Sequence, residues 1–376
     1  MEVLILSCGM GGGHNSAGQA VAEELRRRGH EVMFLNAYDL KGKKTASVIN
    51  NLYICIAQRV PRLFGAIYFL GDAYRRLPIH SPVYWANGKM AKYLEPLLRS
   101  HRFDAIVATH TFPAQTLTKM KREGKALPPT FFVATDYTCT PFEEESDCDY
   151  TVIPSPELRD EFCRYGFDDS RILSFGIPVR AEFAAEESRA EARRKLGWEE
   201  NQFVMLLSGG SIGAGKIAAS IAALRPFLAE DETRRLIVIC GNNRRLYERL
   251  RKQCAGCGRI TVIERTEQMA DFMHGCDVFI SKPGGLSSTE AAAAGVPLIH
   301  ISPIPGCETR NFRFFADHGM SIPVRSPRRE LRKAVETLCS PAAADAMRQA
   351  QRDNLDRFST ARLCDLIEHT AGSSHE

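Results

Sequence analysis

The sequence has no apolar run close to the ~18 residues that a membrane-spanning helix needs. The nearest candidate, Phe64–Gly71, is much shorter. The start of the chain has no basic leader and soon reaches a run of glycines, so Met1–Cys8 is expected to be a first β-strand and not a signal peptide. The 12 cysteines are scattered singly, which is typical of a reducing compartment. We therefore expect a cytoplasmic protein without a membrane span.

Several catalytic and metal-binding motifs are absent or incomplete. No G-x-S-x-G elbow occurs, which argues against an α/β-hydrolase. The first glycine-rich turn has His14 where a dinucleotide fingerprint needs glycine, and a later turn has Ile217 where a P-loop needs Ser or Thr. Residues 147–149 form a D-x-D pattern and 254–257 a C-x-x-C pattern, but both are common by chance, and no second cysteine pair lies nearby. We expect no bound metal.

Short apolar runs typical of strands alternate with helical patterns along the chain, which predicts α/β architecture with parallel sheets covered by helices. The pattern restarts after Gly176-Ile177-Pro178. We therefore expect two doubly wound domains, over residues 1–177 and 178–350, followed by a C-terminal helix and tail over 351–376. The last helical stretch could pack on either domain.

Ligands of open α/β sheets bind at the carboxyl ends of the strands, where this chain carries several glycine-rich turns. The first, Gly9–His14, leads from a strand into a helix, so its backbone can approach a ligand and offer free N–H groups. His14 is a titratable group at that helix start and can serve as a general base near neutral pH. The alternative is a generic glycine turn.

Three later turns carry groups suited to a nucleotide diphosphate. Residues 208–216 follow a strand at 203–207, and such a loop can cradle phosphate without the missing P-loop hydroxyl. Residues 282–290 follow a strand at 278–281; two glycines open a helix, and Glu290 is suited to a sugar's vicinal hydroxyls. Residues 305–311 bring polar groups to the start of another helix.

Positive charge is concentrated in one segment. Residues 41–102 contain 11 Lys or Arg against two acidic residues, although the whole chain has a formal net charge of only +4. Aromatic residues are interleaved with this charge, which suits an anionic surface such as lipid headgroups or nucleic acid. The alternative is a solvated helical face with ordinary core aromatics. No RNA-binding signature accompanies the segment, so nucleic acid is not the expected partner.

The ordered set of motifs resembles glycosyltransferase family 28 and, within it, the diacylglycerol sugar transferases. These are the plant-type monogalactosyldiacylglycerol synthases and the bacterial processive diacylglycerol glucosyltransferases. The matching pieces span positions 11 to 311 in family order: Gly11-Gly12-Gly13-His14 with Ser16-Ala17, Thr135-Asp136-Tyr137, Gly176–Arg180, Gly209-Gly210-Ser211, Cys240–Asn243, Lys282–Gly285 with Thr289-Glu290, and Pro305-Gly306 with Glu308 and Asn311.

The resemblance implies the GT-B fold, in which two Rossmann-like doubly wound parallel-sheet domains face each other across a cleft. It implies His14 as the catalytic base, Asp136 as a catalytic or acceptor contact, and an acceptor beside Gly11, Gly12 and Gly13. The implied donor site would hold UDP-sugar with no cofactor or metal required. Its residues would be Arg180, Gly209, Gly210, Ser211, Gly241, Asn242, Ile263, Glu264, Lys282, Gly284, Gly285, Leu286, Ser287, Thr289, Glu290, Glu308 and Asn311.

Individual donor roles follow from the same resemblance. Glu290 would bind the ribose, and the backbone of residues 263–264 would read uracil. Residues 209–211 would hold the diphosphate with Arg180, and Lys282 would help to neutralise it as it departs. Glu308 and Asn311 would contact the hexose.

The basic aromatic segment is expected to dock the protein on an anionic membrane that contains diacylglycerol. The candidate docking residues are Arg59, Arg62, Phe64, Tyr68, Phe69, Arg75, Arg76 and Trp85. The expected location is therefore the inner face of the cell membrane, as a peripheral protein.

The expected reaction is inverting transfer of a hexose from a UDP-sugar to the 3-hydroxyl of 1,2-diacylglycerol. Glucose is favoured over galactose because bacterial members of this type use it, although Cys307 stands where the glycerolipid enzymes carry glutamine. The alternatives are a UDP-GlcNAc-type transferase that acts on another lipid-linked acceptor, such as a peptidoglycan precursor, and a non-catalytic nucleotide-sugar-binding protein.

Overall fold

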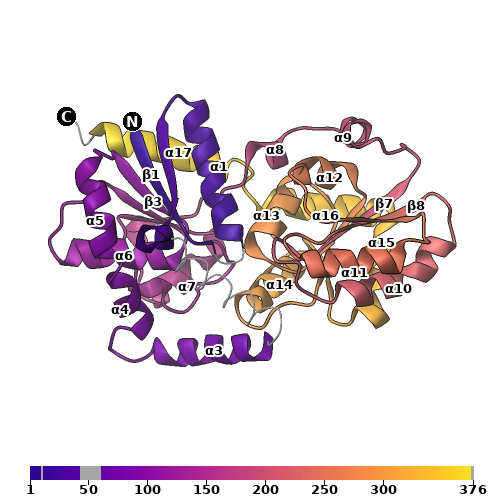
Figure 1. Ribbon diagram of the computed structural model, residues 1–376, viewed down its shortest axis with the longest axis horizontal. Helices are drawn as coiled ribbons and strands as arrows, with labels where there is room; N and C mark the ends of the chain where they lie inside the picture. Colours follow the sequence, from indigo (N-terminus) through magenta and orange to yellow (C-terminus); the bar gives the residue numbers. More distant parts are fainter. Residues whose placement is uncertain (10–11, 43–60, 374–376) are drawn as a thin grey trace. The chain divides into compact units, whose positions relative to one another are not determined.

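The computed structural model describes residues 1–9, 12–42 and 61–373, and the chain divides into two compact units (Figure 1). Unit 1 comprises Met1–Ala181 and Asp356–Glu376, and unit 2 comprises Glu182–Leu355. Each unit contains one six-stranded parallel sheet, as the alternating pattern predicts. Among the described residues, no helix has both the length and the apolar character needed to cross a membrane.

Unit 1 has the strand order β2-β1-β3-β4-β5-β6. Its strands are β1 (Glu2–Ser7), β2 (Glu31–Asn36), β3 (Ala105–Ala108), β4 (Thr130–Val133), β5 (Tyr150–Val152) and β6 (Ile172–Leu173). Its α-helices are α1 (Gly13–Arg27), α3 (Pro61–Tyr74), α4 (Pro82–Gly88), α5 (Ala91–Ser100), α6 (Thr111–Arg122), α7 (Arg159–Arg164) and α17 (Ser359–Ser373). Short 3-10 turns are η1 (Ala37–Lys41), η2 (Glu143–Glu145), η3 (Pro156–Leu158) and η4 (Asp169–Arg171).

Unit 2 has the strand order β12-β11-β10-β7-β8-β9. Its strands are β7 (Phe203–Ser208), β8 (Arg234–Ile239), β9 (Ile260–Ile263), β10 (Val278–Ser281), β11 (Leu298–Ile301) and β12 (Ile322–Val324). The helices are α8 (Ala181–Ala184), which begins at the last residue of unit 1, α9 (Arg189–Leu196), α10 (Ile217–Ala229), α11 (Arg244–Cys254), α12 (Met269–Gly275), α13 (Gly285–Ala293), α14 (Cys307–Asp317), the π-helical turn η5 (Pro327–Leu331), α15 (Arg332–Leu338) and α16 (Pro341–Asn354).

The strands of each sheet are parallel, and the helices that connect them cover the faces of the sheet. Consecutive residues of a central strand such as Val278–Ser281 are all buried, so an unbroken apolar run is stable there. The core of unit 1 packs β1 and β3 against the apolar faces of α1 and α17. Leu363 and Ile367 of α17 are fully buried in this core.

The strand order places a topological switch point in each sheet, where successive crossovers leave in opposite directions. In unit 1 this point lies between β1 and β3, which pair from Val3↔Ala105 to Leu6↔Ala108. In unit 2 it lies between β7 and β10, which pair up to Ser208↔Ser281. The glycine-rich turns expected to bind ligands leave these strands at the switch points.

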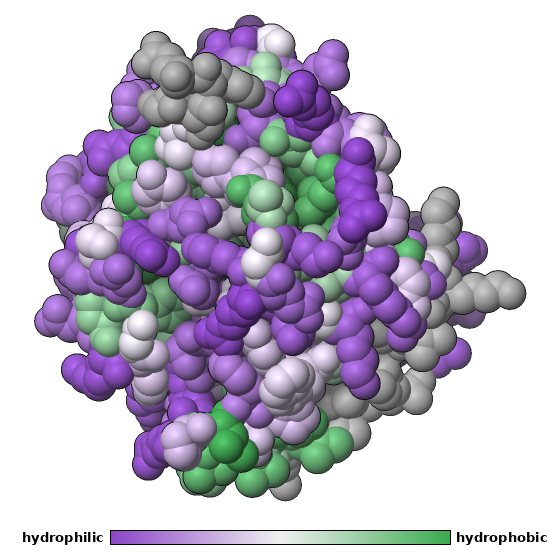
Figure 2. All heavy atoms as spheres, turned by 90° about the vertical axis from the view of Figure 1, so that its left-hand side faces the viewer, coloured by the Kyte–Doolittle hydropathy of each residue, from purple (hydrophilic) through white to green (hydrophobic). Residues whose placement is uncertain are grey.

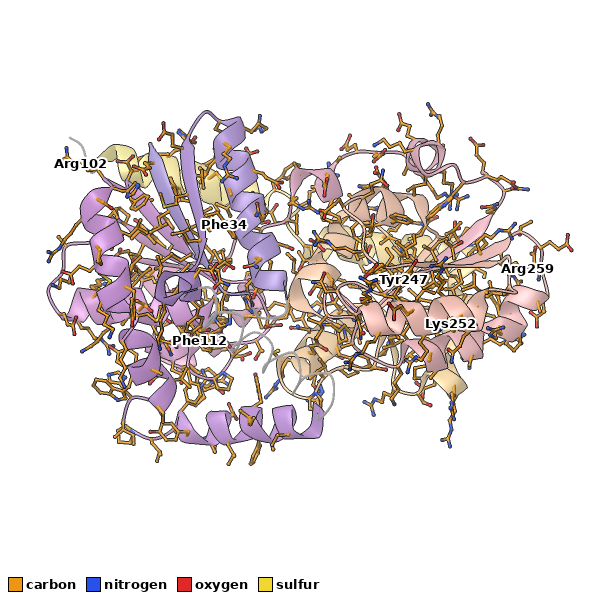
Figure 3. All side chains as sticks on the ribbon, viewed as in Figure 1. Phe34, Arg102, Phe112, Tyr247, Lys252 and Arg259 are labelled. Carbon is orange, nitrogen blue, oxygen red and sulfur yellow. The ribbon has the colours of Figure 1, made fainter. Side chains whose placement is uncertain are left out.

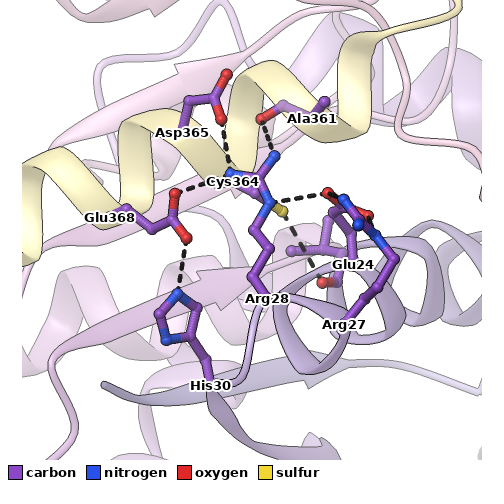
Figure 4. A network of polar contacts seen from close by, with 9 residues as sticks. Glu24, Arg27, Arg28, His30, Ala361, Cys364, Asp365 and Glu368 are labelled. Atoms are coloured by element: carbon purple, nitrogen blue, oxygen red, sulfur yellow. Dashed lines mark hydrogen bonds and ion pairs between the residues drawn. The ribbon is translucent and has the colours of Figure 1, made fainter.

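The C-terminal stretch divides between the two units. Helix α16 belongs to unit 2, whereas α17 packs beside α1 in unit 1. Arg28 donates hydrogen bonds to Asp365 and Glu368 of α17 at 2.6 and 2.8 Å, and His30 contacts Glu368 (Figure 4). The first unit therefore ends four residues beyond the expected 177, and it also includes the end of the chain.

Candidate active site

In unit 1, His14 lies in the first turn of α1, beside the switch point of the sheet. Gly12 precedes the helix with φ of 83°, a left-handed conformation that favours glycine. The Nδ1 atom of His14 lies 2.9 Å from the carbonyl oxygen of Thr109, which follows β3. It also lies 2.8 Å from Oγ1 of Thr135, beyond β4. Three neighbouring strand ends therefore hold this imidazole; we call residues 14, 109, 110 and 135 the His14 centre.

These contacts determine which nitrogen of His14 carries the proton. A carbonyl oxygen can only accept, so the Thr109 contact assigns the hydrogen to Nδ1, and the Thr135 hydroxyl oxygen accepts from the same N–H. In the neutral ring Nε2 then keeps its lone pair. Burial lowers the pKa of His14 to about 4, although the bond to the Thr109 carbonyl opposes this. The imidazole is therefore neutral at pH 7 and chemically competent to accept a proton at Nε2.

Asp136 follows Thr135 directly and is half-buried. The Asp136 carbonyl accepts the N–H of Thr138 at 2.8 Å, which forms a tight turn after β4. Burial raises the pKa of nearby Glu143 to about 8, and the Asp136 carboxylate contributes to the rise. The structure thus places the expected Asp136 next in the chain to a residue of the His14 centre. Of the expected acceptor glycines, Gly12 and Gly13 adjoin His14, while Gly11 lies outside the described residues.

In unit 2, the turns after β7 and β8 are in direct backbone contact. The N–H of Asn242 donates to the carbonyl of Ser211 at 2.8 Å. A Cβ atom at Gly241 would lie 2.5 Å from the carbonyl oxygen of Gly210, so no larger residue fits without a shift. The turn after β10 joins them, because Cε of Lys282 would lie 3.0 Å from a Cβ at Gly210. We call residues 209–211, 241–242, 282–285 and 308 the donor-loop centre.

Lys282 and Glu308 form an ion pair at this centre. The other carboxylate oxygen of Glu308 accepts the N–H of Ile304 at 2.9 Å. Their side chains are 14% and 10% exposed. A Cβ at Gly284 would lie 3.3 Å from the Lys282 ammonium, so this cation sits against the glycine turn that opens α13. The arrangement can stabilise an anion if the ammonium turns from the carboxylate to the ligand.

Three of the expected donor residues are buried within unit 2. Asn311 is fully buried, and its amide donates to the carbonyl of Pro283 at 3.0 Å. Thr289 is buried and donates to the carbonyl of Gly285 within its own helix at 2.8 Å. Leu286 is buried on the same helix. The side chains of Asn311 and Thr289 thus bond within unit 2, and their expected contact with the donor stays a prediction. These side chains stabilise α13 and α14.

The remaining expected donor residues lie on α13, after β9 and at the end of the first segment of unit 1. Glu290 lies on α13 and is 9% exposed, and the Ser287 hydroxyl donates to the carbonyl of Gly284 at 3.3 Å. The carbonyl of Ile263 accepts the N–H of Cys240 at 3.0 Å, so its backbone belongs to the sheet, and Glu264 is the first residue beyond β9. Arg180 belongs to unit 1. Within unit 2, the structure brings together the glycine turns and Lys282.

Helix α3 and the segment after it expose an unusual amount of apolar surface. The large exposed residues there are Leu63, Ile67, Phe69, Leu70, Leu77, Ile79 and Trp85. They gather at the lower edge of unit 1 (Figure 2). We call these seven residues the apolar face. The mixture of aromatic and basic residues in the sequence indicated Phe69 and Trp85 but not Leu63, Ile67 and Leu70, although their i, i+4, i+7 spacing marks one side of a helix.

The expected docking cations have different environments. Arg76 is exposed, but the Arg75 side chain is only 2% exposed and donates to Glu144 at 2.7 Å. Its guanidinium also lies over the ring of Tyr165. A buried ion pair therefore already engages Arg75, which the docking prediction had placed at the lipid surface. Tyr68 is half-buried. Arg59 lies outside the described residues, as do the side chains of Arg62 and Phe64.

The D-x-D pattern has a structural role. Asp149 accepts hydrogen bonds from Lys121 at 2.8 Å and from the backbone and hydroxyl of Thr130. Asp147 pairs with Arg171 at 3.0 Å. Both carboxylates join elements of unit 1 around β4 and β5, so protein cations and donors already balance their charge.

Comparison with known proteins first establishes the class. The structure of Acinetobacter baumannii MurG superposes with a TM-score of 0.61 at 18% identity, covering 98% of this chain and 99% of that one. With two parallel six-stranded sheets in separate units, the chain has the expected GT-B glycosyltransferase fold.

Family models then identify the particular family. Residues 14–179 match monogalactosyldiacylglycerol (MGDG) synthase, and residues 204–362 match the glycosyltransferase family 28 C-terminal domain. The chain belongs to the diacylglycerol glycosyltransferases of family 28. Among its relatives, a processive diacylglycerol beta-glucosyltransferase of Bacillus pumilus is 26% identical over 98% of this chain and 95% of its own length. A probable chloroplastic monogalactosyldiacylglycerol synthase of Glycine max is 27% identical over 93% and 67%.

Proposed function

We propose that this protein is an inverting transferase that moves glucose from UDP-glucose to the 3-hydroxyl of 1,2-diacylglycerol at a membrane surface. The observation that carries the proposal is His14, a neutral imidazole whose free Nε2 lies at the switch point of the first sheet. Glucose is preferred as the donor sugar because the Bacillus pumilus relative, aligned over nearly the whole chain, is a glucosyltransferase.

In the proposed reaction His14 Nε2 takes the proton of the lipid hydroxyl. The hydroxyl oxygen forms a bond to the anomeric carbon as the bond from that carbon to the phosphate oxygen breaks, and UDP leaves with the electron pair. Attack from the face opposite the phosphate inverts the anomeric configuration. The transition state is oxocarbenium-like, as in glycoside hydrolysis. Thr109 stabilises the imidazolium by accepting its Nδ1 hydrogen.

The donor-loop centre is proposed to stabilise the leaving UDP. Lys282 carries a positive charge against the glycine turn of α13, whose N-terminus also favours anions. Both can stabilise the charge that develops on the leaving diphosphate. Glu290, on the same helix, is proposed to bind the ribose hydroxyls. No step of this scheme requires a metal ion, because protein groups supply the positive charge.

The apolar face is proposed to dock the protein on the membrane that holds its acceptor. Diacylglycerol stays in the bilayer, so the enzyme must reach the interface. Exposed apolar side chains enter the headgroup boundary, and each nearby Lys or Arg adds about 1 kcal/mol on anionic lipid. This surface would place the protein on the inner face of the cell membrane as a peripheral protein.

The test uses purified protein and vesicles of diacylglycerol with phosphatidylglycerol, with UDP-glucose, UDP-galactose or UDP-GlcNAc and with EDTA present. We expect β-glucosyldiacylglycerol by mass spectrometry and NMR, with UDP-glucose the best donor. His14→Ala should lower kcat by about 10²–10⁴-fold. His101→Ala, which removes a histidine at the end of α5, should leave it unchanged.

Other outcomes would select another function. Turnover of UDP-GlcNAc with a different lipid-linked acceptor would replace the diacylglycerol proposal. UDP binding without turnover on any acceptor would indicate a nucleotide-sugar-binding protein. An α-linked product would contradict the inverting mechanism.

A further inference from the structure

His110 is a second histidine at the switch point of unit 1, and the proposed reaction assigns it no role. It follows Thr109 directly and is the N-cap of α6. Its Nδ1 accepts the backbone N–H of Phe112 at 3.0 Å (Phe112 is labelled in Figure 3). A backbone N–H can only donate, so the lone pair of Nδ1 is engaged and the neutral ring carries its hydrogen on Nε2.

The rings of His110 and His14 are in direct contact. Their centroids are 4.3 Å apart with an interplanar angle of 66°, an edge-to-face arrangement. On the His110 side, the ring of Phe112 contacts it at 4.4 Å. The two histidines are held in opposite tautomers: His14 keeps a lone pair at Nε2, whereas His110 keeps a hydrogen there.

We propose that His110 is a positioning residue for His14, holding its imidazole in place and keeping it the sole proton acceptor of the pair. This inference rests on the proposed role of His14 as the base. The capped Nδ1 of His110 cannot take a proton without breaking the bond to Phe112. A proton received by His14 therefore stays on that ring until solvent or product removes it, and it does not pass into the core.

Burial lowers the pKa of His14, and the ring of His110 covers one side of that imidazole. Burial and the adjacent His14 lower the pKa of His110 well below its usual value. The other titratable groups of this region include Asp136, next to Thr135, and Glu143, whose pKa is raised. Both belong to the segment after β4. Tyr38 contacts the ring of Phe112, and Cys8 follows β1.

Two substitutions distinguish the effect of the His110 ring from the effect of its hydrogen bond to the Phe112 N–H. His110→Asn removes the ring but retains a side-chain oxygen that can accept the Phe112 N–H, since Asn is a preferred N-cap residue. His110→Phe retains the ring volume but loses the acceptor. His101→Asn serves as the control for a histidine elsewhere in unit 1. Circular dichroism and thermal unfolding establish that each variant is folded.

The readouts are the NMR titration of His14 in histidine-labelled full-length protein, assigned with His14→Ala, and the pH profile of kcat/KM. In His110→Asn we expect the His14 midpoint to rise by one pH unit or more, and the acid limb of kcat/KM to rise with it. In His110→Phe the midpoint should stay near that of the unsubstituted protein, with reduced stability. An unchanged midpoint in His110→Asn would overturn the inference and leave His110 as a helix cap.

Different results would contradict His14 as the base and His110 as its positioning residue. The NMR titration needs no substrate, so it decides the contact between the rings even if no acceptor is turned over. A shifted NMR midpoint with an unshifted acid limb would contradict His14 as the base, and with it the role of His110 in the reaction. Equal shifts of the His14 midpoint in His110→Asn and His110→Phe would also overturn the inference. Such a result would mean that keeping a ring at position 110 does not preserve the midpoint.

Discussion

Replacing Gly241 by alanine tests whether the backbone contact between the turns after β7 and β8 forms the donor site. Gly241 has φ of 61°, and its added Cβ would lie 2.5 and 2.6 Å from the carbonyl oxygens of Gly210 and Ser211. Gly295, with φ of 63° and no atom within 4 Å of its added Cβ, provides a matched control. Both substitutions carry the same backbone strain, but only one forces two turns apart.

The magnitudes follow from this pair. An L-residue in the left-handed region costs roughly 1–2 kcal/mol, so both variants should lose that much stability. At Gly241 the turn must also move by about 1 Å to restore an ordinary contact, and such overpacking costs a further ~1–3 kcal/mol. If the turn holds the diphosphate, UDP affinity should fall about tenfold or more in Gly241→Ala, which corresponds to about 1.4 kcal/mol.

Calorimetric titration with UDP and urea unfolding of both variants provide the assay. We expect Gly295→Ala to bind UDP as the unsubstituted protein does, despite its lower stability. Equal UDP affinity in the two variants would refute the assignment of the donor-loop centre. A loss of affinity in both would show that stability of unit 2, and not the turn geometry, controls binding.

Three further predictions concern other parts of the molecule. Ile367→Ala should destabilise unit 1 by ~2–5 kcal/mol in urea unfolding, because Ile367 is fully buried between α17 and the sheet. Replacing Ile67 and Leu70 by serine should weaken binding to phosphatidylglycerol vesicles about tenfold or more in a sedimentation assay, while Phe358→Ser, an exposed control on unit 1, should not. Burial lowers the pKa of His300 to about 3, so the unfolded chain binds its proton first. Stability should therefore fall as the pH drops below about 6.5, by about 3 kcal/mol near pH 4, and His300→Gln should lessen this acid sensitivity of unfolding.

The alternation of strands and helices was sufficient to predict the fold class and many strand limits. The expected strand at 278–281 coincides with β10, and the one at 203–207 is one residue shorter than β7. Strand β12 has only three residues and contains Pro323, which is tolerated at a sheet edge but weakens the strand pattern in the sequence. The return of α17 to unit 1 depends on long-range packing of Leu363 and Ile367, which helical periodicity alone does not reveal.

The candidate site was predicted less completely than the fold. The glycine turns and His14 can be recognised in the sequence because they directly follow strands, at the sheet edge where ligands bind. The direction of a side chain cannot be recognised in this way: Asn311 and Arg75 are polar residues in suitable places, yet each bonds to a neighbouring element. His110 directly follows a strand-like apolar run in the sequence, but its cap to Phe112 and its contact with His14 depend on three-dimensional geometry.

The path of α17 has a consequence for how the chain is made. Unit 1 is discontinuous in sequence, since residues 182–355 form unit 2 and stand between its two segments. Domains often fold as units during synthesis, beginning from the N-terminus. Here the ribosome completes all of unit 2 before it supplies the helix that closes the core around Val21 and Leu25. The nascent first sheet therefore exposes an apolar face throughout translation of the second unit. During that time the exposed face is a binding site for a chaperone.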